Sequence, residues 1–105
     1  MKVLSSVDEI LMLAVYSLGK EAYGVTIRKK LAEVTGKEWS HGAIYEPLYR
    51  LEKKRLVNSF LSDPTQERGG RSKRMFELSR NGLQVLREHQ KLRDELSGDL
   101  FEKAL

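Results

Sequence analysis

Residues 40–61, SHGAIYEPLYRLEKKRLVNSFL, contain the change of hydrophobic period that decides the fold. In the first part, Ile44, Leu48 and Leu51 fall on one face of a helix that Ser40 can cap at its N-terminus. The last part, residues 56–61, is a short run of apolar, β-branched and aromatic residues, which is typical of a strand. The stretch therefore predicts a helix followed closely by a β-strand.

Two further helical patterns precede this stretch. Ser6 and Glu9 have the spacing of a capping pair at the start of the first helix, and Gly19 marks its end. The second pattern covers residues 24–35, and Gly36 is expected to cap it. The apolar positions of this second helix are Ile27, Leu31 and Val34.

A second strand and a fourth helix follow. Residues 72–78 alternate well enough to pair with residues 56–61 across a long loop rich in turn residues. Ser79 is the expected N-cap of a last helix that continues to Leu100, with Gly98 weakening its end. The order predicts a mainly α (α+β) fold: a winged helix-turn-helix of three helices plus a two-stranded β-hairpin wing, with an added C-terminal helix.

Length and composition exclude several classes of protein. A chain of 105 residues and 12.1 kDa fits one domain. Its 32% of charged residues and zero cysteines exclude a membrane protein, a disulfide framework and a thiolate zinc site. No apolar run approaches the ~20 residues of a membrane-spanning helix, and no targeting segment is visible, so we expect a cytoplasmic protein without a membrane partner.

No residue pattern supports catalysis. The two histidines, His41 and His89, are far apart in the pattern, and the HExxH, GxSxG and GxxxxGK[ST] motifs are absent. Neighbouring acids such as Asp94 and Glu95 do not face one another on a helix. We therefore expect that the protein is not an enzyme and has no cofactor and no metal site.

The positive charge is concentrated in the middle of the chain. The net charge is +4, and residues 41–80 contain nine Lys and Arg against five Asp and Glu, whereas residues 81–105 contain four against five. Within this basic part, two glycines let the backbone approach a phosphate closely. The expected phosphate-binding residues of the wing are Arg68, Gly69, Gly70, Arg71, Lys73 and Arg74. The alternative is a basic loop that is only solvated.

The outward face of the helix after Ser40 mixes small, aromatic and basic side chains. The residues expected to face DNA are Ser40, Gly42, Tyr45, Tyr49 and Arg50, with Lys53 nearer the edge. The two tyrosines would position the helix through hydroxyl contacts to phosphate, or would instead be aromatic residues at the edge of the core. Glu46 opposes DNA binding unless it accepts a hydrogen bond from a cytosine amino group, and Pro47 is expected to bend the helix.

Two helices have apolar faces with no obvious partner in the chain. The first helix is apolar nearly all round, and the last has an apolar stripe, so a second copy is expected to cover both. The expected dimer contacts are Leu11, Val15, Val85, His89, Leu92, Leu96 and Leu100. Residues 1–79, with the wing at about 56–78, would form the DNA-binding domain, and residues 80–105 the dimerisation helix, within one compact domain.

Several motifs resemble the PadR family of bacterial transcriptional regulators. They are residues 22–25 (AYGV), 43–45 (AIY), 48–57 (LYRLEKKRLV), 64–74 (PTQERGGRSKR) and 79–82 (SRNG). The resemblance implies a homodimer whose C-terminal helix packs against the partner's N-terminal and C-terminal helices. It also implies a repressor that a small molecule or a stress signal releases from DNA. Glu46 separates Tyr45 from Pro47, whereas family members often place the proline directly after the tyrosine. Trp39 precedes the recognition helix, so no known effector site carries over.

Together these features predict a DNA-binding transcriptional regulator, a homodimeric repressor on a pseudo-palindromic operator in double-stranded DNA. Its half-site centres would lie ~34–36 Å or a multiple of that apart. The alternative is a winged-helix adaptor that binds an acidic protein through the basic face. A third function, the sensing of an apolar small molecule of unknown identity in the dimer cavity, is compatible with the first.

Overall fold

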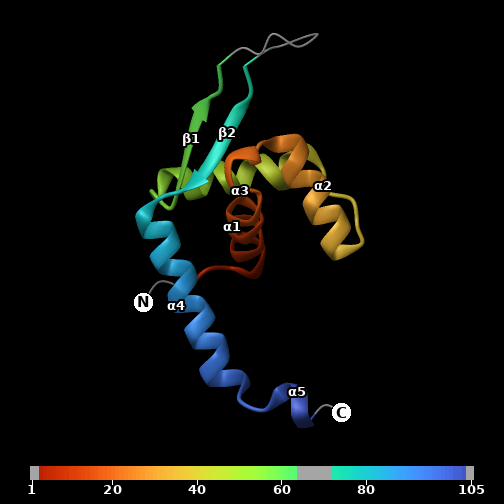
Figure 1. Ribbon diagram of the computed structural model, residues 1–105, viewed down its shortest axis with the longest axis vertical. Helices are drawn as coiled ribbons and strands as arrows, with labels where there is room; N and C mark the ends of the chain where they lie inside the picture. The colour runs from red at the N-terminus through yellow and green to blue at the C-terminus, as the bar shows by residue number, and fades with distance from the viewer. Residues whose placement is uncertain (1–2, 64–71, 104–105) are drawn as a thin grey trace.

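The computed structural model describes residues 3–63 and 72–103 and has the winged-helix architecture predicted from the sequence. In chain order the elements are α1 (Ser6–Leu18), η1 (Gly19–Glu21), α2 (Gly24–Thr35), α3 (His41–Lys53), β1 (Val57–Leu61), β2 (Arg74–Leu78), α4 (Arg80–Ser97) and α5 (Leu100–Lys103). The β1–β2 hairpin projects from one end of the helical body, and α4 extends from the opposite end (Figure 1). The two ends of the molecule are therefore free for different contacts.

Side-chain caps fix where the helices begin. The Ser40 hydroxyl oxygen accepts a hydrogen bond from the Ala43 N–H at 3.1 Å, and the Ser79 oxygen accepts one from Gly82 at 2.9 Å, as the sequence predicts. The predicted cap of α1 is wrong by one residue, because Ser5 and not Ser6 accepts from the Asp8 N–H. A capping box with Glu9 does not form.

The hairpin is antiparallel and tied to the helices at its base. Val57 lies opposite Leu78 and Leu61 opposite Arg74, so both strands are shorter than the predicted 56–61 and 72–78. The Phe76 N–H donates to the Ala22 carbonyl at 2.8 Å, just before α2 begins. This bond fixes the base of the wing relative to the helix-turn-helix.

The core lies where α1, α2, α3 and the hairpin meet. Its largest fully buried side chains are Leu11, Met12, Val15, Ile27, Ile44, Leu48, Leu51, Val57 and Phe76. Of the three apolar positions of α2, Ile27 and Leu31 are buried, whereas Val34, near the end of the helix, is 73% exposed. α3 continues through Pro47, which is buried, as one helix from His41 to Lys53.

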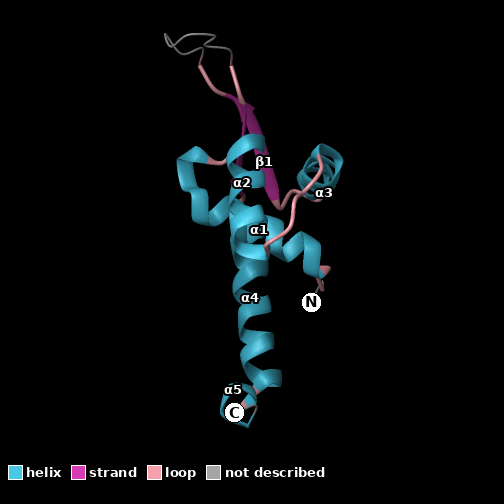
Figure 2. Cartoon of the chain, turned by 90° about the vertical axis from the view of Figure 1, so that its right-hand side faces the viewer, coloured by secondary structure: helices cyan, strands magenta, loops and turns pink. Residues whose placement is uncertain are grey.

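The last helix is shorter than the sequence predicts. Gly98, at φ +50°, ends α4, and Leu100 belongs to the separate short helix α5, so the expected continuous helix to Leu100 is wrong. The first half of α4 packs on the core through Val85 and Leu86, whereas its second half extends away from the body (Figure 2). None of the described helices is long and apolar enough to span a membrane.

Candidate nucleic-acid interface

The outer face of α3 is open to solvent along its length. Ser40, Glu46, Tyr49, Arg50 and Lys53 are exposed, and Gly42 and Tyr45 are half-buried. The opposite side of the helix carries the buried residues of the core. The helix thus presents to solvent most of the face that the sequence assigned to DNA.

Tyr45 has a packing role between α2 and α3. Its hydroxyl lies directly over Gly24, where a Cβ atom would be only 1.8 Å from the Tyr45 oxygen. A glycine is needed at position 24 for this close approach. This is the core-edge role that the sequence left open for Tyr45, and it directs the hydroxyl towards α2.

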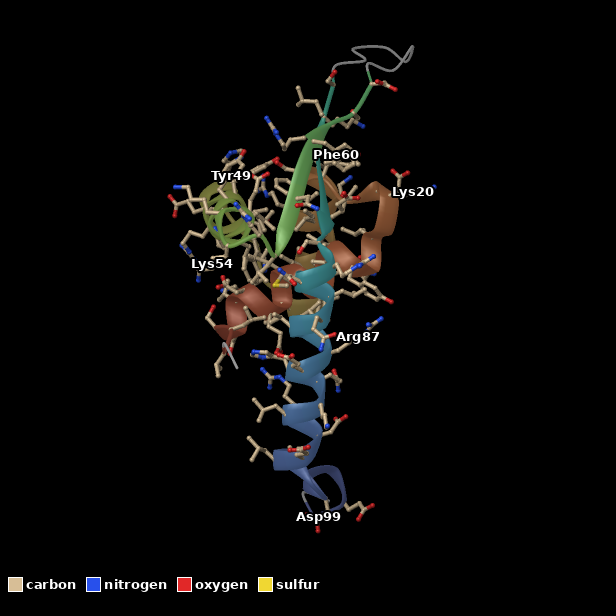
Figure 3. All side chains as sticks on the ribbon, turned by 90° about the vertical axis from the view of Figure 1, so that its left-hand side faces the viewer. Lys20, Tyr49, Lys54, Phe60, Arg87 and Asp99 are labelled. Atoms are coloured by element: carbon tan, nitrogen blue, oxygen red, sulfur yellow. The ribbon has the colours of Figure 1, made fainter. Side chains whose placement is uncertain are left out.

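Tyr49 joins α3 to the hairpin and stays exposed. Its ring centroid lies 5.8 Å from that of Tyr45 and 6.3 Å from that of Phe76 on β2. On the same side, the Glu52 carboxylate accepts hydrogen bonds from the backbone N–H and the hydroxyl of Ser59 on β1. In Figure 3 Tyr49 lies on the α3 side of the hairpin, away from Lys20. These contacts hold the wing against the recognition helix.

Arg50 is turned back towards α1. One of its guanidinium nitrogens, Nη2, lies 3.6 Å from Asp8 Oδ1, a buried carboxylate oxygen that makes no hydrogen bond with the described part of the chain. This ion pair could not be predicted from local sequence patterns, because its two residues are far apart in the chain. A DNA contact by Arg50 stays a prediction.

The described cations of the wing lie at the loop end of its two strands, where Leu61 pairs with Arg74. Lys73 Nζ lies 4.4 Å from the centre of the Tyr23 ring and 3.4 Å from its hydroxyl oxygen. Arg74 is exposed, with Nη1 3.4 Å from the Ser59 hydroxyl oxygen. The contact of Tyr23 with Lys73 was not predicted from the sequence. The feature that could have indicated it is an aromatic residue directly before a helix with basic side chains. The predicted residues Arg68, Gly69, Gly70 and Arg71 lie outside the described residues.

The predicted dimer residues divide into two groups. Leu11 and Val15 are 0% and 2% exposed within a single chain, so their assignment to a dimer interface is wrong: α2, α3 and the hairpin already cover that side of α1. His89 is also buried within the single chain, where it contacts Leu4 and Glu9. Val85 and Leu92 are half-buried, and Leu96 and Leu100 are exposed.

A hollow of about 710 Å³ lies behind the hairpin, on the side away from α3. Its apolar walls include Val15, Tyr16, Phe60, Met75, Leu78 and Leu83, and Lys20 and Glu77 also line it. The register places Phe60 opposite Met75, with Glu77 on the same face of β2, so this wall is the back of the wing. The hollow is of the size and polarity that suit a small apolar molecule.

Comparison with protein families identifies the chain. The model of the transcriptional regulator PadR-like family matches residues 12–88, which include the helix-turn-helix, the hairpin and the first half of α4. The chain belongs to the PadR-like family. Family members are DNA-binding transcription regulators and not enzymes. No curated protein matches the sequence at a significant level.

Solved structures share the fold along nearly the whole chain. A PadR-like transcription factor from Bacteroides fragilis is 25% identical, with 91% of this chain and 87% of that one aligned and a TM-score of 0.71. A PadR family regulator from Eggerthella lenta is 26% identical (90% and 80% aligned, TM-score 0.66). RosR of H. salinarum, 21% identical (92% and 80% aligned, TM-score 0.73), shows the fold alone.

Proposed function

We propose that this PadR-like protein is a homodimeric repressor whose two α3 helices enter the major groove at the half-sites of a pseudo-palindromic operator. The observation that carries the proposal is the separation of two free surfaces. The hairpin projects from one end of the helical body, and the second half of α4 extends from the opposite end (Figure 1). The first end has the exposed face of α3 and the wing cations, and the second has the exposed apolar side chains of Leu96 on α4 and Leu100 on α5. One surface is suited to DNA and the other to a second copy.

The N-terminal half of α3 would supply the base contacts. Ser40, Gly42 and Glu46 leave it open, with small or polar side chains that let the helix approach base edges. Lys53, Lys73 and Arg74 are exposed cations on α3 and the wing, suited to phosphates on either side of the groove. The proposal extends to the undescribed wing residues Arg68, Gly69, Gly70 and Arg71.

Replacing Arg74 with Gln tests the wing contact. Arg74 is exposed and, among the residues that the structure describes, makes one long hydrogen bond, to Ser59, so the fold should tolerate the change. We expect weaker binding to all DNA sequences alike, and a slope of log affinity against log salt that is smaller by about one unit. Fluorescence anisotropy titrations at several salt concentrations measure both quantities.

Arg87→Gln is the matched control, because Arg87 is an exposed arginine of α4 and its replacement changes the net charge equally. Its salt slope should equal that of the wild type. An unchanged slope in Arg74→Gln would remove Arg74 from the phosphate contacts.

Repression is tested in cells with a reporter gene under the DNA upstream of the protein's own gene. We expect expression of the regulator to lower reporter output, and the output to recover when the bound sequence is scrambled. An increase in output would make the protein an activator. Weak retardation of every DNA equally in a gel shift would favour the adaptor function instead.

Effector release is the second part of the proposal, and the hollow behind the wing favours it. A molecule bound there would contact Phe60 and Met75 on the wing and Tyr16 on α1, and so could displace the wing. This site differs from the dimer cavity expected from the sequence. In a thermal-shift screen, we expect an apolar molecule to raise the melting temperature of the wild type and to have little effect on Phe60→Gln. Equal shifts in both proteins would place the ligand elsewhere.

A further inference from the structure

A buried polar network joins the N-terminal segment, α1 and α4. His89 on α4 contacts two partners: its Nε2 atom is the acceptor for the Leu4 backbone N–H at 2.9 Å, and its Nδ1 atom lies 2.8 Å from Glu9 Oε2. The other oxygen of Glu9 accepts a hydrogen bond from Arg93 Nε at 2.8 Å. The side chains of His89 and Glu9 are only 5% and 10% exposed. These bonds connect residues 80 to 85 positions apart in the sequence.

The bond from Leu4 determines the protonation state of the imidazole. A backbone N–H can only donate, so His89 Nε2 must accept and carries no proton. The proton of the neutral ring is therefore on Nδ1, which donates to the Glu9 carboxylate. The structure thus contains the neutral form of His89, in one defined tautomer.

A second proton on His89 is incompatible with the Leu4 contact. Protonated Nε2 would place one N–H against another, in a side chain that is only 5% exposed. Among the described residues, the charged groups at this site are Glu9 from α1 and Arg93 from α4, and the N-terminal segment contributes only a backbone amide. The Glu9 bond persists in both protonation states, so the contact that changes is the one to Leu4.

The N-terminal segment also forms part of the surface proposed for dimerisation. Val3 and Leu4 line a hollow of about 420 Å³ together with Leu92, Leu96 and Arg93 of α4. Release of Leu4 would withdraw apolar side chains from this surface and weaken the contact with a second copy.

We propose that His89 is a proton-sensitive clasp: in its neutral form it holds the Leu4 segment on α4, and its protonation releases that segment and weakens dimerisation and DNA binding. The effect on dimerisation rests on the function proposed above, whereas the release of Leu4 does not. The clasp is closed while His89 Nε2 carries no proton and opens when Nε2 gains one.

The first arm of the test is an NMR titration of the full chain between about pH 7.5 and about pH 5.5, the range in which histidine titrates. Ring ¹⁵N shifts report the protonation of His89, and the Leu4 amide resonance reports the clasp. We expect the Leu4 amide to lose its hydrogen-bonded shift and its protection from exchange with the same midpoint as His89. A Leu4 amide that stays unchanged while His89 gains its proton would overturn the proposal. This arm needs no DNA, so it remains decisive even if the proposed function fails.

The second arm measures DNA affinity in the His41→Gln background, which removes the only other histidine of the chain. We expect binding to weaken about tenfold over the same pH range, as the loss of one buried hydrogen bond implies. The matched variant adds His89→Gln, whose amide oxygen can accept from Leu4 and whose amide N–H can donate to Glu9 without titrating. Its affinity should be independent of pH. Equal pH dependence in the two variants would show that His89 does not control binding.

Discussion

Leu96→Glu should convert the protein to a monomer and lower its affinity for a two-half-site operator about a thousandfold, since linked half-sites contribute factors of this order. Leu96 is 79% exposed in the single chain, so the carboxylate stays solvated in a monomer. In a dimer that covers this face, the same carboxylate would be buried without a partner, at a large cost in free energy. Light scattering measures the mass, and anisotropy the affinity.

Lys91→Gln is the matched control, because it lowers the net charge by the same single unit at an exposed position of α4. It should remain dimeric and bind as the wild type does. Light scattering of the wild type is informative as well: a monomer at micromolar concentration would rule out the proposed dimer.

Gly82→Ala should lower the free energy of unfolding by about 3 kcal/mol, the upper part of the range for overpacking. A Cβ atom at position 82 would lie 2.0 Å from the backbone carbonyl oxygen of Leu56. That carbonyl cannot easily move away, because it also accepts the Ser79 N–H at 3.0 Å. The start of α4 and the start of the hairpin would therefore have to separate. Urea denaturation followed by circular dichroism measures the change.

Gly42→Ala is the control for this prediction. A Cβ atom there lies 3.8 Å from the nearest atom, an oxygen of Glu46, which is an ordinary contact. Since alanine is a better helix former than glycine, the stability should be unchanged or higher by up to about 1 kcal/mol. Equal stabilities of the two variants would show that the contact between α4 and Leu56 does not constrain the fold.

The sequence predicted those elements that depend on local signals. The helical spacing of Ile44, Leu48 and Leu51 predicted α3, and the change of period after Arg55 predicted the hairpin. The predictions that Ser40 and Ser79 cap their helices were correct, because each is the single serine directly before its helix. In these places, residues close in the chain carry the information that defines the element.

The wrong predictions concern positions where two neighbouring residues fit the local pattern equally well, and contacts between residues far apart in the sequence determine which one is used. Ser5 and Ser6 have the same capping chemistry, and Glu9, the expected partner of Ser6, instead bonds His89 and Arg93. In the same way, a helix that is apolar nearly all round does not reveal which face the chain itself covers. Leu11 therefore looked available for a partner, although it is completely buried.

The sequence predicted which face of α3 is exposed, but not the contacts that individual side chains on that face make. The exposed face of α3 could be inferred from its period, because its opposite side is apolar. The direction of two side chains could not be inferred. Tyr45 packs over Gly24, and Arg50 pairs with Asp8, and both contacts depend on how α3 crosses α2 and α1.

Selection of binding sites from random duplexes with the full chain tests whether the protein binds DNA sequence-specifically as a dimer. We expect an enriched motif with two-fold symmetry and half-site centres ~34–36 Å apart or a multiple of that. At one fixed salt concentration, the chain should bind this motif about a thousandfold more tightly than a scrambled duplex. Enrichment of no motif, with equal affinity for both duplexes, would contradict this expectation.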